Sequence, residues 1–345
     1  MKYLVKISPL EPYSFGGDQN FKYKDEVPTG KESYFLRSKE VPEQTTILGT
    51  LRYLILQEKG LLKTSFTYDV EERNKMKGYI GGESFSYLKT KAQNFGSLKS
   101  ISPVFLMNQG GDILVKNPFH NTAENGYQAM KMGASVETSY GNISLPLVGE
   151  YDAKNGHAYG FINLSNKKVE TGLFDTKLVV GNQKNGTEES KKDGFFKREM
   201  KTLKEGYCFA VYVETEEDVL PQKTVAYMGK KKSAFLIETE KERPDDLSEK
   251  VQACFCEGDI WYYALSDIVV QQPLNYGQFC IVEEKYQRNL ETIHGENGHA
   301  KRVKSEIRHH LIESGSVFYQ TEPVIAENEN AKQIGYNRVV KIGGK

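Results

Sequence analysis

One segment of this chain carries a clear helical pattern, and it limits the folds that the rest can adopt. After Pro42, apolar residues recur at helical spacing, namely Ile47, Leu48, Leu51, Leu54 and Ile55. Residues 43–46 supply candidate N-caps, and Lys59 and Gly60 form a basic end with a C′ glycine. Gly49 inside this helix costs about 1 kcal/mol relative to alanine. That cost indicates that another backbone packs tightly against the helix or that a ligand approaches it.

The rest of the chain has mainly strand-like patterns. Apolar and polar residues alternate in the opening segment, which predicts a strand that ends at Pro9. Residues 15–21 are expected to form a glycine-bearing loop. Two hairpins are predicted, one from 104–107 and 113–115, the other from 195–203 and 207–213 through a turn at 204–206. Further strands are predicted at 233–238, 251–256, 260–265 and 316–320, and long polar loops at 181–194, 238–249 and 283–306.

One helix among many short strands favours an α+β fold with antiparallel sheets over a doubly wound α/β fold. Glycine and short polar residues accumulate between Pro146 and Tyr159. We therefore expect a first domain over residues 1–150 and a second over residues 151–345.

Charge excludes one class of protein. The chain has 46 Lys and Arg against 46 Asp and Glu, so it does not hold nucleic acid or anionic lipid by bulk positive charge. The longest uncharged stretch, residues 268–282, contains Pro273 and several amides, so no membrane segment is expected and the protein is predicted to be cytoplasmic. Four cysteines without CxxC spacing predict neither a disulfide framework nor a zinc site.

Local basic groups stand beside glycines and aromatic residues. Cations gather between Lys184 and Lys204, Lys230 and Lys231 follow Gly229, and the tail around Tyr336 is basic. A glycine lets peptide N–H groups approach a phosphate, lysine neutralises the phosphate, and an exposed ring stacks a base. For each segment alone an ordinary turn or solvated face is the simpler interpretation, and three such segments together favour RNA binding.

Signals for catalysis are sparse. The sequence has no nucleotide-binding P-loop, dinucleotide fingerprint, HExxH or GxSxG motif. His309 and His310 are adjacent and would face opposite ways on a strand. One of them could act as general acid or base on an RNA 2′-hydroxyl, although a half-buried strand histidine is the simpler interpretation.

Several segments taken in order resemble the RAMP-superfamily subunit that caps the crRNA five-prime handle in type III-B CRISPR (Cmr) effector complexes. The opening strand runs into residues 10–21, similar to the family's first motif, and residues 45–52 match its helix of hydroxyl, apolar, glycine and arginine positions. Residues 180–213, 226–230, 315–319 and 334–337 resemble its central and later glycine-bearing segments. The chain departs from the family in lacking the arginine of the first motif and in having Phe196 at a tyrosine position.

The resemblance implies two ferredoxin-like (RRM-like) RAMP modules with glycine-rich loops and a protruding β-hairpin carrying Lys197 and Arg198. It also implies a non-catalytic subunit without a cofactor, acting in antiviral defence. The implied partners are the crRNA five-prime handle, the large polymerase/cyclase-like subunit and the backbone RAMP subunits. Two alternatives remain open, a metal-independent RAMP endoribonuclease using His309 or His310, and a scaffold that touches only protein.

The residues expected to contact RNA form one continuous cradle under this hypothesis. They are the glycines Gly16, Gly17, Gly49, Gly181, Gly229 and Gly335, the polar or aromatic residues Gln19, Thr46, Asn182, Tyr336 and Asn337, and the cations Arg52, Lys184, Lys197, Arg198, Lys230, Lys231 and Arg338. For Arg52, a structural role and an RNA contact are equally expected.

Overall fold

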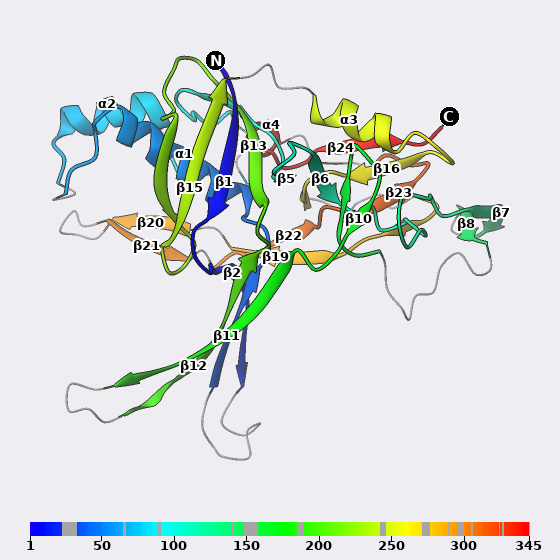
Figure 1. Cartoon of the computed structure of the whole chain (residues 1–345), viewed down its shortest axis with the longest axis horizontal. Coiled ribbons are helices and arrows are strands. Elements are labelled where there is room, and N and C mark those ends of the chain that lie inside the picture. The colour runs from blue at the N-terminus through cyan, green and yellow to red at the C-terminus, as the bar shows by residue number, and fades with distance from the viewer. Residues whose placement is uncertain are drawn as a thin grey trace.

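The computed structural model describes residues 1–22, 33–64, 67–88, 91–139, 141–147, 158–184, 190–241, 246–270, 277–288, 290–294, 300–304, 306–323, 325 and 328–344. Within these ranges the helices are α1 (Gln44–Glu58), α2 (Val70–Ile80), α3 (Leu247–Cys254) and α4 (Glu329–Gln333). None of these helices is both long enough and apolar enough to span a bilayer. Strands far outnumber helices, which confirms the predicted α+β class (Figure 1).

The largest sheet of the described chain has nine strands, all paired antiparallel. Its order is β10 (Val169–Glu170), β9 (Phe161–Asn163), β6 (Ile113–Lys116), β5 (Phe105–Asn108), β13 (Tyr207–Thr215), β1 (Lys2–Pro9), β15 (Ser233–Lys241) and β14 (Lys223–Met228), with β4 (Leu98–Ile101) also paired to β13. Strands from both sides of residue 150 therefore share one sheet, and residues 148–157 of the expected boundary lie outside the described residues.

Each face of this main sheet covers a separate core. On one face, Val5 of β1 and Phe209 of β13 pack with the apolar side of α1, including Leu51. On the other face, Leu4 and Tyr212 pack with α3 and a second sheet that includes Trp261. Because successive residues of a strand point to opposite faces, both neighbours in a pair such as Leu4 and Val5 are buried. The central strands are therefore apolar almost throughout.

Smaller sheets complete the body. The second sheet has the order β18 (Cys280–Ile281), β23 (Val317–Tyr319), β16 (Trp261–Ala264) and β24 (Val339–Ile342). A third contains β17 (Ile268–Val270), β22 (His309–Ile312) and β19 (Glu284–Gln287). Two hairpins stand apart, β7 (Met132–Thr138) with β8 (Gly141–Pro146), and β20 (Leu290–His294) with β21 (Ala300–Lys304).

A four-stranded sheet projects from the body as an arm (Figure 1). Its order is β11 (Phe174–Lys184), β12 (Ser190–Leu203), β3 (Ser33–Lys39) and β2 (Phe15–Lys22). The β12–β3 pairing is parallel, and the two flanking pairings are antiparallel. Two hairpins distant in sequence thus lie side by side and share one sheet.

The predicted helix is confirmed as α1. Gly60 follows its end with φ +64°, the left-handed conformation that favours glycine. Glu43 occupies the N-cap position, but its side chain makes no cap hydrogen bond. Gly49 is exposed, and a Cβ there would have no heavy atom within 4 Å. The backbone contact expected at Gly49 is therefore wrong for the described part of the chain.

The second predicted hairpin is wrong in its pairing. Strand β12 runs along the arm, whereas β13 enters the main sheet between β5 and β1. Residues Phe209 and Ala210 are both fully buried, on opposite faces of β13. A strand buried on both faces belongs in the centre of a sheet, so β13 pairs with distant strands rather than with its neighbour in sequence.

Three other local predictions are corrected. Residues 15–21 form β2 rather than a loop. A bulge between Gly16 and Gln19 shifts the register, and the strand pairs with β3 on both sides of it. Residues 251–256 are not a strand. They lie in and after α3, whose buried residues Leu247, Val251 and Cys254 are spaced for a helix. The expected loop 181–194 contains the end of β11 and the start of β12, and the expected loop 238–249 contains the end of β15 and the start of α3. The expected loop 283–306 contains strands β19, β20 and β21.

Candidate nucleic-acid interface

The arm carries the predicted cations Lys197 and Arg198 on opposite faces of β12. Lys197 is exposed and lies opposite Val180 of β11 and Phe35 of β3 in the strand registers. The Arg37 guanidinium projects from the same face, 5.9 Å from the centre of the Phe35 ring. We call this surface, made of Arg37, Leu178, Val180 and Lys197, the Lys197 face. It combines two exposed cations with two apolar side chains that are each 57% exposed.

The opposite face of the arm explains Gly181 and Arg198. A Cβ at Gly181 would lie 2.3 Å from the Phe196 ring, which therefore covers this glycine across the strand pair. The Arg198 guanidinium lies 5.3 Å from the centre of the same ring, and its Nε is buried with no hydrogen-bond partner in the described residues. Gly181 is required for this ring packing, and its expected contact with a phosphate stays a prediction.

The root of the arm joins two of the predicted segments. The Lys230 N–H donates a hydrogen bond to the Ser14 carbonyl at 3.0 Å, and a Cβ on Gly16 would lie 3.9 Å from Lys230 Cε. Gly229 has φ +76°, and a Cβ there would lie 2.6 Å from the Ser14 oxygen. The turn between β14 and β15 is thus held against β2, and Gly229 is required for that contact.

Four predicted residues are described by backbone alone. Gly17 and Gln19 lie in β2, and Asn182 and Lys184 lie in β11. Their side chains lie outside the described part of the structure. Lys231 is exposed at the turn between β14 and β15.

The terminal segment is not an RNA loop. Tyr336, expected to be an exposed stacking ring, is completely buried, and its hydroxyl donates to Glu43 Oε2 at 3.1 Å. A Cβ at Gly335 would lie 2.6 Å from the Ser102 carbonyl oxygen. Asn337 is buried and accepts a hydrogen bond from the Val269 N–H at 2.7 Å. This segment packs inside the protein, so its aromatic and glycine pattern reports core packing.

The remaining predicted cations also turn inward. Arg338 Nη2 donates to the Lys332 carbonyl at 3.3 Å. The Arg52 guanidinium lies 5.6 Å from the centre of the Phe95 ring, and its burial lowers its pKa to about 10. Its Nε and Nη2 have no hydrogen-bond partner in the described residues. Thr46 is half-buried, and its carbonyl accepts from the Thr50 hydroxyl. The contact with Phe95 is consistent with the structural role considered for Arg52, and an RNA contact stays a prediction.

The predicted residues consequently do not form one cradle. The structure brings Gly16, Gly229 and Lys230 together at the root of the arm and places Lys197 and Arg198 along the arm. The groups around Arg52 and Tyr336 lie within the body. The exposed basic surface supported by the structure is the arm with its root.

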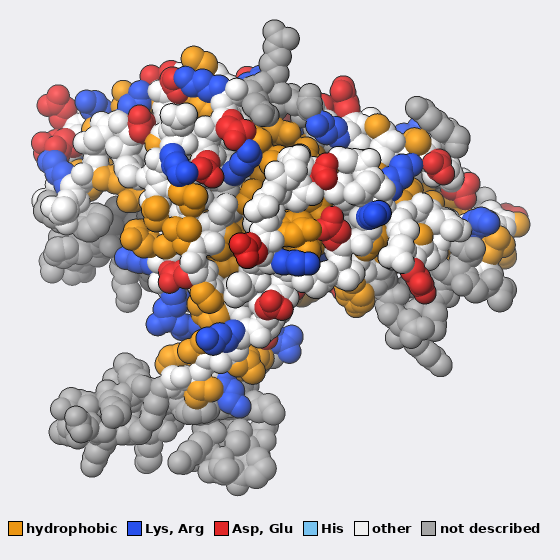
Figure 2. Space-filling model, viewed as in Figure 1, with side chains coloured by type: hydrophobic (Ala, Val, Ile, Leu, Met, Phe, Trp, Pro, Cys, Tyr) orange, Lys and Arg blue, Asp and Glu red, His pale blue; other side chains and the backbone are white. Residues whose placement is uncertain are grey.

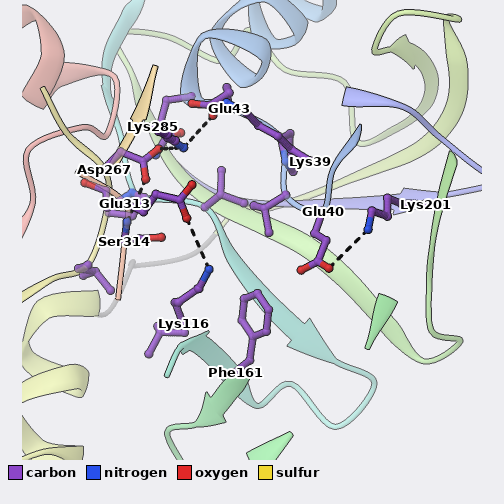
Figure 3. Close-up of a pocket in the computed structure, with 18 of the residues that line it drawn as sticks. Lys39, Glu40, Glu43, Lys116, Phe161, Lys201, Asp267, Lys285, Glu313 and Ser314 are labelled. Atoms are coloured by element: carbon purple, nitrogen blue, oxygen red, sulfur yellow. Dashed lines mark hydrogen bonds and ion pairs between the residues drawn. The ribbon is translucent and has the colours of Figure 1, made fainter. Parts of the chain in front are cut away.

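A cavity of about 320 Å³ lies at the base of the arm, between β3, β12, α1 and the main sheet (Figure 3). Four lysines and four carboxylates line it, namely Lys39, Lys116, Lys201, Lys285, Glu40, Glu43, Asp267 and Glu313. Lys285 Nζ lies 2.6 Å from Asp267 Oδ2 and 2.9 Å from Glu43 Oε1, and Lys39 also pairs with Glu43. The opposite charges balance, so the cavity does not act as an anion cradle. The ion pairs that line it connect the arm to the body, since Lys39 of β3 pairs with Glu43 at the start of α1.

Electrostatics keeps this network ionised. Burial opposes ionisation of Glu43, but Lys285 and Lys39 outweigh it and hold the pKa of Glu43 well below its usual value. Burial alone would lower the pKa of Lys285, yet Asp267, Glu43 and Glu313 together raise it well above its usual value. The Tyr336 hydroxyl joins the network through Glu43 and accepts a hydrogen bond from the Tyr87 hydroxyl at 3.0 Å.

The two adjacent histidines lie on β22 and face opposite ways, as predicted for a strand. His309 is buried, with its ring centre 4.6 Å from that of Tyr87. His310 Nε2 lies 3.2 Å from Glu284 Oε2, and its ring stacks on Tyr286 at 5.3 Å. Within the described residues no group of three or more His, Cys, Asp or Glu is arranged to hold a metal ion.

Sequence reasoning missed Arg37 and Lys39 of β3, which with Lys201 lead from the arm to the body. Arg37 and Lys39 alternate with Ser38 along β3 and so share the Lys197 side of the arm. Lys201 lies on that side of β12, where its Nζ donates to the Thr176 hydroxyl at 2.9 Å. The alternation of residues 33–39 was a usable signal, but it gains meaning only once β3 is known to pair with β12.

Comparison with known proteins supplies the last observation. No protein-family model matches the chain, and no curated protein is detectably similar to it. A chain in the cryo-EM structure of type III-B Cmr-beta bound to cognate target RNA aligns over 97% of this chain and 96% of its own length, with a TM-score of 0.51 and 14% identity. A second structure, with cognate target RNA and AMPPnP, gives 97% and 95% coverage, a TM-score of 0.49 and 13% identity.

The first of these alignments shows that the two chains share a fold almost from end to end. The fold class expected from the family resemblance is therefore confirmed.

Proposed function

We propose that this chain is an RNA-binding subunit of a type III CRISPR effector complex and that it caps the five-prime handle of crRNA. The observation that carries the proposal is the fold likeness over nearly the full length of a chain from type III-B Cmr-beta bound to cognate target RNA. The order of the sequence motifs independently favours the same family. On this proposal the partners are crRNA, the large polymerase/cyclase-like subunit and the backbone RAMP subunits, in the cytoplasm.

The Lys197 face of the arm is the proposed RNA contact. Lys197 and Arg37 are exposed cations on one face of a sheet that projects away from the body (Figure 1). The neighbouring Leu178 and Val180 give apolar contact to ribose and base edges. The chain has no net charge, so binding depends on a few phosphate contacts and weakens as salt is raised.

We propose a non-catalytic role. His309 is buried against Tyr87, and His310 faces Glu284 and Tyr286, which supports structural roles for both histidines. The competing endoribonuclease hypothesis predicts cleavage without metal. Incubating the protein with labelled repeat RNA in EDTA tests it, and a defined cut that His310→Ala abolishes would contradict our proposal.

The binding test uses a variant pair from one face of the arm. Arg37→Ala with Lys197→Ala removes two cations that point the same way, and Arg73→Ala with Lys75→Ala removes an exposed arginine and lysine from α2 as a matched control. Affinity for RNA carrying the repeat of the host array is measured by anisotropy across a salt series. The arm variant should reduce the slope of log K against log salt by about 1.4, since each contact to a single strand contributes roughly 0.7.

The control should leave both the affinity and the salt slope unchanged. If the two double variants behave alike, the arm is not the RNA contact. If the parent shows no preference for repeat RNA over the same RNA with a shuffled five-prime segment, handle recognition by this chain is wrong.

A further inference from the structure

Half of one face of the main sheet carries exposed apolar side chains. On the face away from α1, α3 and the second sheet cover the strands around Tyr212. The other half, over β1, β15 and β14, carries Tyr227 at 64% exposure, Leu10 at 56% and Val225 at 41%. Their neighbours in β14, Ala226 and Met228, point to the α1 side and are buried. Figure 2 shows apolar side chains gathered over the lower part of β14 and β15.

The strand registers order these side chains into rows. Tyr227 pairs with Ala234, and the Leu10 N–H donates to the Ala234 carbonyl at 3.0 Å, so these three residues form one row. Val225 pairs with Leu236 in the next row. We call these five residues the Tyr227 platform. Tyr227 is 64% exposed, and its cross-strand neighbour is the small residue Ala234.

Cations border the platform at the end nearer the arm. Lys230, Lys231 and Lys232 are exposed in the turn that joins β14 to β15. Neither Lys231 nor Lys232 takes part in an ion pair among the described residues. Lys230 contacts Ser14 and approaches Gly16 of β2. The platform and the arm are therefore adjacent across this turn, so an extended ligand bound to one can continue onto the other.

At the far end of the platform, two ion pairs neutralise the lysines. Lys6 Nζ lies 2.6 Å from Glu240 Oε1, and Lys223 Nζ lies 2.7 Å from Glu238 Oε1. At the arm end the exposed Glu11 carboxylate accepts a hydrogen bond from the Ala234 N–H at 2.8 Å, and the exposed Lys231 and Lys232 outnumber this one negative charge. An anionic ligand is therefore drawn toward the arm end. A flat aromatic surface beside exposed cations is the combination that binds single-stranded nucleic acid.

A ribonucleotide fits this surface better than a protein. Three exposed side chains cover far less than the roughly 800 Å² that each partner buries in a stable protein interface. One exposed tyrosine ring matches the area of one base, and the lysine turn supplies the charge that a phosphate requires.

We infer that the Tyr227 platform stacks a base of the same single-stranded RNA that the arm binds, while Lys231 and Lys232 contact its backbone. This inference rests on the proposed function and adds a second contact site, separate from the Lys197 face. The RNA would pass from the arm across the β14–β15 turn onto the Tyr227 platform.

The test uses Tyr227→Trp as a reporter of stacking. The chain has one tryptophan, Trp261, which is completely buried, so a tryptophan at position 227 dominates the ligand-dependent fluorescence. Titration with ten-residue oligoadenylate and with repeat RNA, followed by fluorescence and by anisotropy, should give quenching that saturates with binding. Tyr227→Ala should raise Kd five- to tenfold, and Tyr227→Phe should stay within twofold because the ring remains.

The matched control is Tyr159→Ala, since Tyr159 is 63% exposed but lies outside the platform. It should leave Kd unchanged. If RNA binds and the Arg37 and Lys197 variant weakens it, yet the reporter is not quenched and Tyr227→Ala has no effect, the platform inference is wrong and the proposed function stands. If Tyr227→Ala instead loses only the association with partner subunits, the platform is a protein interface and the inference is overturned. If no RNA binds at all, both proposals fail.

Discussion

Replacing Lys285 with methionine removes the central cation of the network at the base of the arm. Lys285 bridges Asp267 at 2.6 Å and Glu43 at 2.9 Å, and all three side chains are at most 16% exposed. Methionine keeps a similar volume without charge. The variant therefore isolates the electrostatic contribution from side-chain packing.

The expected cost follows from what each carboxylate retains. Glu43 keeps its ion pair with Lys39 and the hydrogen bond from Tyr336, whereas Asp267 keeps only the Ser314 N–H, at 3.0 Å, among its described side-chain contacts. Breaking a buried pair and leaving one charge behind costs about 3–5 kcal/mol. We expect a loss of about 3 kcal/mol in the free energy of unfolding at pH 7, since Asp267 retains one donor.

The sign of the pH dependence provides a second readout. Glu43 has a lowered pKa in the folded state, so its contribution is present above the unfolded pKa of about 4.3 and is lost as the pH falls. Removing Lys285 raises the folded pKa of both neighbouring carboxylates. The deficit of the variant should therefore be largest at pH 7 and shrink toward pH 4, where these carboxylates become protonated.

Urea denaturation of the parent and of Lys285→Met, at several pH values between 4 and 7, measures both effects. Lys116→Met is the control, because Lys116 Nζ lies 3.8 Å from Glu313 Oε2 and both side chains are 29% exposed. That half-exposed pair should contribute less than about 1 kcal/mol. A loss at Lys285 no larger than the control, or one that does not change with pH, would refute the reasoning.

Two further predictions concern stability. Gly335→Ala should lower the free energy of unfolding by at least about 3 kcal/mol, because its φ is +97° and the new Cβ would lie 2.6 Å from the Ser102 oxygen. The control Gly111→Ala, at φ +82° in open space, should lower it by about 1–2 kcal/mol. Equal losses for the two variants in urea denaturation would contradict this prediction. Burial lowers the pKa of His120 to about 3, so stability should fall by about 1.4 kcal/mol per unit as the pH drops below about 6.5. His120→Phe should remove this slope between pH 6 and 5, and an unchanged slope would assign it to other groups.

Local patterns anticipated the elements whose partners lie close in sequence. The spacing from Ile47 to Ile55 predicted α1, and the glycine-rich turn at 108–112 predicted the β5–β6 hairpin. The same reasoning failed for β12 and β13. Both have strand character, but their partners are β3, β11, β1 and β5, and strand propensity does not specify a partner.

The candidate site shows the same division. Lys197 was found from the sequence because a cation on a strand is visible there, whereas its companion Arg37 was not, since β3 and β12 meet only through a parallel pairing. Tyr336 and Tyr227 are both tyrosines close to glycines and lysines. One is completely buried and the other is 64% exposed. Their neighbours in sequence do not tell them apart.

The amino-acid sequence by itself determined the class of the fold, the position of α1 and the absence of bulk charge, because each follows from spacing or composition within a short window. The tertiary structure alone decided which glycines meet backbone, which cations remain exposed, and that Glu43 pairs with Lys285, 242 residues away. Burial and pairing are properties of surfaces brought together by folding. They depend on long-range packing that no local pattern contains.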